Sequence, residues 1–133
     1  MKRICKLSVL LAFVTLLLTS CHQEKPVGTP HRARYELISK DGTPLNMGVN
    51  YVTQTGIGIG QGIESKEETV ITPWNHEFTI YGSFQFLIIC NDKEENINDR
   101  KPFVARIYLD DNLIAEQESD QFYSIYFSHF YKE

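Results

Sequence analysis

From Arg32 onward, polar and apolar residues alternate along the chain in short runs that end at turn signals. Arg32 to Leu37 alternates with a period of two, and the segment Asp41-Gly42-Thr43-Pro44 then marks a turn. No stretch combines the 3.6-residue period with the capping residues of an amphipathic helix. The same pattern predicts further strands at 45–51, 67–72, 77–81, 84–90, 102–109, 113–118 and 121–131. Seven or eight short strands in about 100 residues predict an all-β domain, specifically a β-sandwich.

Two of these segments carry more specific expectations. Residues 84–90 are almost wholly apolar, which predicts a central strand with both faces largely covered. Cys90 ends this strand, and a single free Cys in such a setting is expected to be a small buried hydrophobe. Asp110-Asp111-Asn112 predicts a hairpin turn, because Asp and Asn tolerate left-handed backbone better than most residues.

The N-terminus has the layout of an export signal. Three basic residues precede an apolar run from Leu7 to Leu18, which is too short for a comfortable membrane span of about 20 residues. The run ends in Leu18-Thr19-Ser20-Cys21, which resembles the lipobox of bacterial lipoproteins. That resemblance implies a signal peptide at 1–20, lipid attachment at Cys21, and cleavage before this Cys. Residues 21–31 then read as a lipidated, flexible tether, and residues 32–133 as the β-sandwich domain.

Removing the signal changes the charge of the chain. The full sequence has a formal net charge of −4, but Lys2, Arg3 and Lys6 leave with the signal and no acidic residue does. Ten basic residues then face 17 acidic ones, a balance of −7. This acidic balance argues against a nucleic-acid binder, which needs a basic footprint to neutralise phosphates. It also argues against electrostatic docking on anionic lipid, so the lipid anchor is the expected link to the membrane. His22 is not the Asp that retains lipoproteins at the inner membrane of enteric bacteria, which favours the outer membrane.

Part of the mature chain resembles a known family. Thr72-Pro73-Trp74-Asn75 precedes a short strand, and Ala105 to Ile114 contains an Ile-Tyr-Leu-Asp hairpin. This order is similar to the extracytoplasmic domain of the mycobacterial MmpS proteins and of similar exported domains. The resemblance spans roughly residues 32–130 and implies an immunoglobulin-like β-sandwich that assists large exporters. Asp111 departs from the family's hairpin Gly, and a lipobox replaces the family's transmembrane helix.

Three groups of residues are candidate metal or phosphate sites. The four His residues, His22, His31, His76 and His129, lack the close spacing of a metal pair, so no metal is expected. The Gly-rich segment 55–63 lacks the spacing of a phosphate-binding loop, which leaves connecting structure or a surface for strand addition. The oxygen-rich segment 91–99 lacks the glycine and terminal Glu of an EF-hand, so a solvated loop is favoured over a weak calcium site.

The aromatic residues offer the remaining binding candidates. Trp74 follows Pro73 and is expected to pack, with a sugar-stacking platform as the alternative. The last strand places aromatics on both faces, so one set must face the core and the other is a candidate exposed patch. This set contains Phe122, Tyr123, Tyr126, Phe127, Phe130 and Tyr131.

No catalytic constellation is recognisable, because the chain has no nucleophile elbow and no Cys–His pair with a local signature. We therefore expect a non-enzymatic envelope protein that needs no cofactor and binds another envelope protein, as an accessory to export or assembly. A module that binds a glycan or a small molecule is the first alternative, and a structural spacer is the second.

Overall fold

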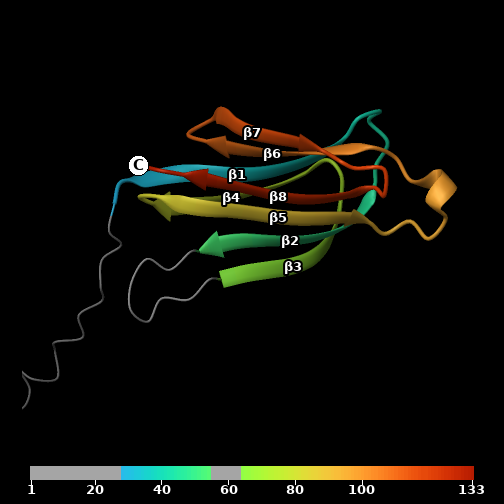
Figure 1. Ribbon diagram of the computed structural model, residues 1–133, viewed down its shortest axis with the longest axis horizontal. Coiled ribbons are helices and arrows are strands. Elements are labelled where there is room, and N and C mark those ends of the chain that lie inside the picture. Colours follow the sequence, from blue (N-terminus) through green and yellow to red (C-terminus); the bar gives the residue numbers. More distant parts are fainter. Residues whose placement is uncertain (1–27, 55–63) are drawn as a thin grey trace, which may run out of the picture.

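The computed structural model describes residues 28–54 and 64–133, which form an all-β domain (Figure 1). The predicted signal peptide, Cys21 and the Gly-rich segment 55–63 lie outside the described residues. Eight strands and one 3-10 turn, η1 (Ile97–Asp99), make up the domain. The strands are β1 (Pro30–Ser39), β2 (Asn46–Gln54), β3 (Glu64–Ile71), β4 (Trp74–Tyr81), β5 (Phe84–Asp92), β6 (Phe103–Leu109), β7 (Asn112–Glu118) and β8 (Ser124–Tyr131).

The strands form two antiparallel sheets of four strands each, so the predicted β-sandwich is confirmed. The first sheet has the order β4-β1-β6-β7, and the second has the order β3-β2-β5-β8. In an immunoglobulin domain, strand B pairs with E in one sheet and strand C pairs with F in the other. The pairs β1–β4 and β2–β5 reproduce this arrangement. Here, however, β6 takes the place beside β1 that the first strand of an immunoglobulin domain takes, and it is reached only after β5.

The core lies between the sheets and is built from alternate residues of each strand. Tyr35 and Leu37 of β1 face Phe86 and Ile88 of β5, and all four side chains are fully buried. Aromatic rings fill much of this space, and Tyr35 alone contacts the rings of Tyr51, Phe78 and Phe86. Cys90 is fully buried in the same core, as the sequence predicted.

The hydroxyl of Tyr35 joins three strands at the point where β2 and β5 separate. It donates a hydrogen bond to the carbonyl of Val52, with an O–O distance of 2.8 Å. It also accepts one from the backbone N–H of Leu87, at 3.2 Å. Regular pairing of β2 with β5 ends at Tyr51 and Ile88, so the hydroxyl satisfies two backbone groups that the ladder no longer pairs.

Four strands begin two or three residues away from the predicted position, and two of them, β3 and β4, begin three residues early, at Glu64 and Trp74. Pro30 and His31, which were expected in the tether, belong to β1 and pair with Tyr81 and Ile80. β8 begins at Ser124 instead of Gln121, because Asp120 forms a turn ahead of it. The Asp120 carboxylate accepts hydrogen bonds from the backbone N–H groups of Phe122 and Ser124.

The prediction for the apolar strand at 84–90 is correct in one respect and wrong in another. β5 is central, since it lies between β2 and β8. Only one of its faces is buried, because Gln85 and Ile89 are exposed and Leu87 is only half-buried. A continuous apolar sequence therefore produced an apolar outward face on this strand.

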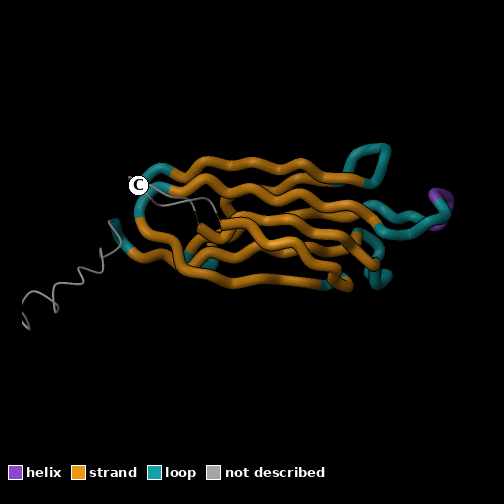
Figure 2. Tube along the Cα trace, turned by 90° about the horizontal axis from the view of Figure 1, so that it is seen from below, coloured by secondary structure: helices purple, strands orange, loops and turns teal. Residues whose placement is uncertain are grey.

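The loops gather at two opposite ends of the strands (Figure 2). The start of β1 and the C-terminus lie at one end (Figure 1). There the backbone N–H of Thr29 donates to the Glu133 carboxylate. The predicted hairpin turn between β6 and β7 is confirmed, and both Asp110 and Asp111 have positive φ angles of 48° and 67°. The turn η1 lies in the β5–β6 loop at the other end (Figure 2).

Candidate interaction face

Exposed apolar side chains lie next to each other on the outward face of β5 and β8. Ile89 pairs directly with Tyr126, and the two side chains are 37% and 67% exposed. Phe130, which is 59% exposed, pairs with Gln85, and the half-buried Leu87 pairs with Ser128 between them. We call the surface formed by Leu87, Ile89, Tyr126 and Phe130 the β5–β8 face.

This face follows from the alternation of β8. Ile125 and Phe127 point into the core and are almost fully buried, so Tyr126 and Phe130 must point outward. The prediction that one aromatic set faces the core while the other is exposed is therefore confirmed. Phe122 adds a further exposed ring, but it lies in the β7–β8 turn and not on the strand.

Charged residues dominate the outward face of the first sheet instead. Arg106 on β6 binds Glu116 on β7 and Glu36 on β1, with N–O distances of 2.6 Å and 3.4 Å. The Arg34 guanidinium lies 4.2 Å from the ring centroid of Tyr108 on the same face. All five ion pairs found within residues 28–54 and 64–133 join groups of the first sheet and its adjoining loops. The β5–β8 face has no such pairs.

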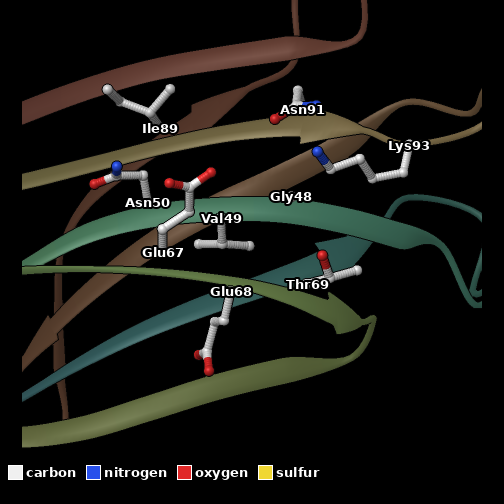
Figure 3. A pocket seen from close by; sticks show the side chains of 9 residues that line it. All are labelled: Gly48, Val49, Asn50, Glu67, Glu68, Thr69, Ile89, Asn91 and Lys93. Carbon is white, nitrogen blue, oxygen red and sulfur yellow. The ribbon is translucent and has the colours of Figure 1, made fainter.

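A shallow hollow of about 370 Å³ adjoins the β5–β8 face across β2 and β3. Figure 3 shows its lining, in which Ile89 and Asn91 from β5, Asn50 from β2 and Glu67 from β3 gather on one side. Glu67 and the neighbouring Glu68 point to opposite sides of β3 (Figure 3).

Gly48 forms the floor of this hollow and makes room for a lysine. A Cβ atom built on Gly48 would lie 2.5 Å from Lys93 Cε and 2.9 Å from Asn91 Oδ1. The Lys93 side chain therefore crosses the bare backbone of β2 and brings its ammonium group over Gly48. The outward surface of the second sheet is thus apolar over β5–β8 and polar over β2–β3.

Trp74 does not belong to this surface. It lies on the inward side of β4 and packs against the core, in ring contact with Tyr51 at a centroid distance of 5.3 Å and with His76 at 6.3 Å. The expected packing role of Trp74 is confirmed. Burial and the nearby Lys66 lower the pKa of His76, which keeps this ring neutral within the aromatic cluster.

The structure gives no support for a metal site within the part of the chain that it describes. His76 is on β4 and His129 is on β8, at edges of different sheets, and the structure does not bring them together. No group of three or more His, Cys, Asp or Glu side chains among the described residues could hold a metal ion.

In the oxygen-rich loop after β5, side-chain oxygens accept hydrogen bonds from backbone N–H groups of the same loop. Asp92 accepts from the N–H of Glu94, Glu94 from that of Asn96, and Asn96 from that of Asn98. This succession of short-range hydrogen bonds explains the loop's composition without a calcium ion. Ile97 remains exposed at its tip.

Cys90 is unsuited to nucleophilic chemistry. Burial raises the pKa of its thiol to about 12, so almost no thiolate forms at neutral pH.

Neither the hollow nor the outward exposure of β5 was predicted from the sequence. A Gly inside a strand marks a place where another group approaches the backbone closely, so Gly48 carried a usable signal. The polar residue Gln85 within the apolar run also hinted that one face of β5 is open. Neither signal identifies Lys93 or Glu67 as neighbours, because they come from separate segments.

Comparison with known proteins does not assign this chain to a family. No protein-family model matches the chain, and no curated protein sequence matches it.

Proposed function

We propose that this protein is a lipid-anchored, non-enzymatic component of the bacterial cell envelope. In this proposal it binds another envelope protein through the β5–β8 face, as an accessory to an export or assembly system. The resemblance to MmpS-type domains supports the accessory role, and the lipobox supports export and anchoring, with the outer membrane favoured over the inner.

One observation carries the proposal: Ile89, Tyr126 and Phe130 expose apolar surface side by side on a face without ion pairs. Water in contact with this surface is released when a partner covers it, which favours association by about 25 cal/mol per Å² of apolar area. Aromatic residues are enriched in protein interfaces because they bury much area with few rotatable bonds. On the opposite sheet, Arg106 is paired with Glu36 and Glu116, and charged side chains occupy the centre of the outward face.

Capture of a partner after crosslinking in intact cells tests this proposal. Ile89→Lys places a charge at the centre of the β5–β8 face, and we expect it to reduce partner capture at least tenfold. Leu113→Lys is the matched control, because Leu113 is also an exposed aliphatic residue on a strand, but on the charged sheet. Partner yield is measured by quantitative mass spectrometry, and thermal unfolding checks that both variants are folded.

Wild type and Leu113→Lys should enrich the same envelope protein, and Ile89→Lys should lose it. Equal capture by all three chains would reject the β5–β8 face as the binding surface. If no chain enriches any envelope protein above background, the spacer alternative replaces the proposal.

The exposed rings of Tyr126 and Phe130 also favour a second candidate, a module that binds a glycan or an amphipathic small molecule. Aromatic rings stack on the apolar faces of sugars, and the polar hollow beside Ile89 supplies hydrogen-bonding groups. Trp74 is not part of this candidate, since it packs on the core. A glycan array probed with wild type and Tyr126→Ala separates the candidates: a specific signal that the variant loses favours the ligand-binding module.

β1 starts beside the C-terminus at one end of the sandwich, so an anchor at Cys21 would attach at that end (Figure 1). In residues 28–54 and 64–133, no helix has the length and apolar character needed to cross a membrane.

Metabolic labelling with an alkyne fatty acid tests the anchor. We expect wild type and Cys90→Ser to carry the label and Cys21→Ala to lose it, because the proposed lipid bond is made by the Cys21 thiol. Label that persists in Cys21→Ala would reject the lipobox interpretation.

A further inference from the structure

The four edge strands of the sandwich differ in how they are protected against pairing with another strand. β3 carries Glu64, Lys66, Glu67 and Glu68, and β7 carries Glu116 and Glu118 together with an irregular register against β6. β4 carries Glu77. Charges and bulges of this kind prevent association at exposed edges. β8, the fourth edge, has eight residues and no Asp, Glu, Lys or Arg among them.

Three contacts show which backbone groups of β8 point away from β5. The N–H of Leu87 is directed to the β2 side, where it meets the Tyr35 hydroxyl, so its pair Ser128 is not hydrogen-bonded to β5. The Tyr126 carbonyl accepts from the Gln117 side chain at 3.4 Å, and Ser124 bonds to Asp120, both away from β5. Because the direction alternates along a strand, the N–H and C=O groups of Tyr126, Ser128 and Phe130 all face the free edge.

We propose that β8 pairs with β8 of a second copy of this chain, antiparallel and with Ser128 on the twofold axis. Tyr126 then lies opposite Phe130 of the second copy, and Ser128 opposite its own counterpart. All three positions direct their backbone groups to this edge, so the pairing forms a regular hydrogen-bonded ladder in which the Phe130 N–H of the second copy replaces the Gln117 side chain on the Tyr126 carbonyl. The second copy also contributes its own Tyr126 and Phe130, so apolar side chains of both copies lie on either side of the central pair of Ser128 residues.

The composition of β8 favours a second copy as the occupant. In a twofold interface the residue on the axis meets its own copy, and the other residues of the strand meet residues of the same strand in the second copy. A strand with charges of one sign would therefore oppose like charges. β8 has no Asp, Glu, Lys or Arg, and its exposed aromatic residues Tyr126 and Phe130 are symmetric about Ser128. The nearby carboxylates of β7 are already paired, Glu116 with Arg106 and Glu118 with Lys40.

The dimer is tested by disulfide crosslinking of the full chain in its native membranes. In an antiparallel hydrogen-bonded pair the two Cα atoms lie about 5.5 Å apart, which is within disulfide range. We therefore expect Ser128→Cys to give a band at twice the monomer mass after mild oxidation. Ser124→Cys is the matched control: it is on the same strand and face, but its counterpart in the dimer is about 27 Å away, eight residues at about 3.4 Å.

Wild type supplies the background from the chain's own cysteines, of which Cys90 is buried and, in the proposed mature protein, Cys21 carries the lipid. A Ser128→Cys chain that stays monomeric, or that crosslinks no better than Ser124→Cys, would overturn the proposal. A product that contains a different protein would also overturn it, since the edge would then belong to another partner.

A second variant removes the backbone donor without adding a thiol. The Ser128 N–H points to the free edge, a position where an edge strand tolerates Pro. We expect Ser128→Pro to weaken dimerisation at least tenfold, measured by sedimentation of the detergent-solubilised chain, with thermal unfolding as the check on folding. A folded Ser128→Pro chain that dimerises like wild type would overturn the proposal. Ile89→Lys is expected to dimerise normally, because Ile89 is on a central strand, so loss of partner capture and loss of the dimer are separate results.

Discussion

The two outward faces of the sandwich are built on strands of similar length yet present opposite chemistry. On the first sheet, Arg106 links Glu36 and Glu116 across three strands, and Arg34 covers the ring of Tyr108. On the second sheet, Ile89, Tyr126 and Phe130 expose apolar surface to solvent. Charged groups on the first face contact one another within the sheet. The apolar side chains on the second face remain in contact with water unless another molecule covers them. This difference is the basis for proposing the second sheet, and not the first, as the binding surface.

The largest expected effect is a difference in the free energy of unfolding between variants on the inward and the outward side of the second sheet. Phe86 is fully buried on β5, so Phe86→Ala should lower the free energy of unfolding by about 3–5 kcal/mol. Phe130 is an aromatic residue of the adjacent strand, yet Phe130→Ala should change it by no more than about 0.5 kcal/mol. Urea unfolding followed by the fluorescence of Trp74, the only Trp in the chain, measures both. A Phe130→Ala cost near that of Phe86→Ala would show that the ring serves the fold, which would break the comparison.

A smaller expected effect is a difference between the two outward faces in how the free energy of unfolding of their variants depends on salt. Arg106→Leu removes both ion pairs of a partly exposed guanidinium and should cost up to about 1 kcal/mol at low ionic strength. The cost should shrink toward zero in about 1 M salt, because screening acts within roughly 3 Å there.

Gln85→Leu is the matched variant on the second sheet, where Gln85 makes an uncharged hydrogen bond with Ser128. Its effect should not depend on salt. Unfolding curves at two salt concentrations check this, and the same salt response in both variants would contradict the assignment of charge to the first sheet.

The strand pattern of the fold was predictable because it depends on local spacing. Alternation from Arg32 to Leu37 and the turn at Asp110-Asp111 both act over a few residues, and both are found in the structure. The buried state of Cys90 was also predictable, since its neighbours are apolar.

The candidate face was predictable only in part. The aromatic residues of β8 had to divide between two sides, but sequence alone did not say which side meets the first sheet. The exposure of Ile89 was predicted wrongly, because an apolar residue in an apolar run has no local feature that separates an inward from an outward position. The hollow beside it joins Gly48, Glu67 and Lys93 from three segments, which no local pattern relates.

By itself, the sequence determined an all-β domain and the order of its strands along the chain. These properties follow from residue spacing and composition, which need no knowledge of distant contacts. The tertiary structure alone decided that Tyr35 joins β2 to β5, that Arg106 pairs with Glu36 and Glu116, and that β8 is an edge strand. Each of these depends on which strands become neighbours, and strand order in a sandwich is set by contacts between residues far apart in the chain.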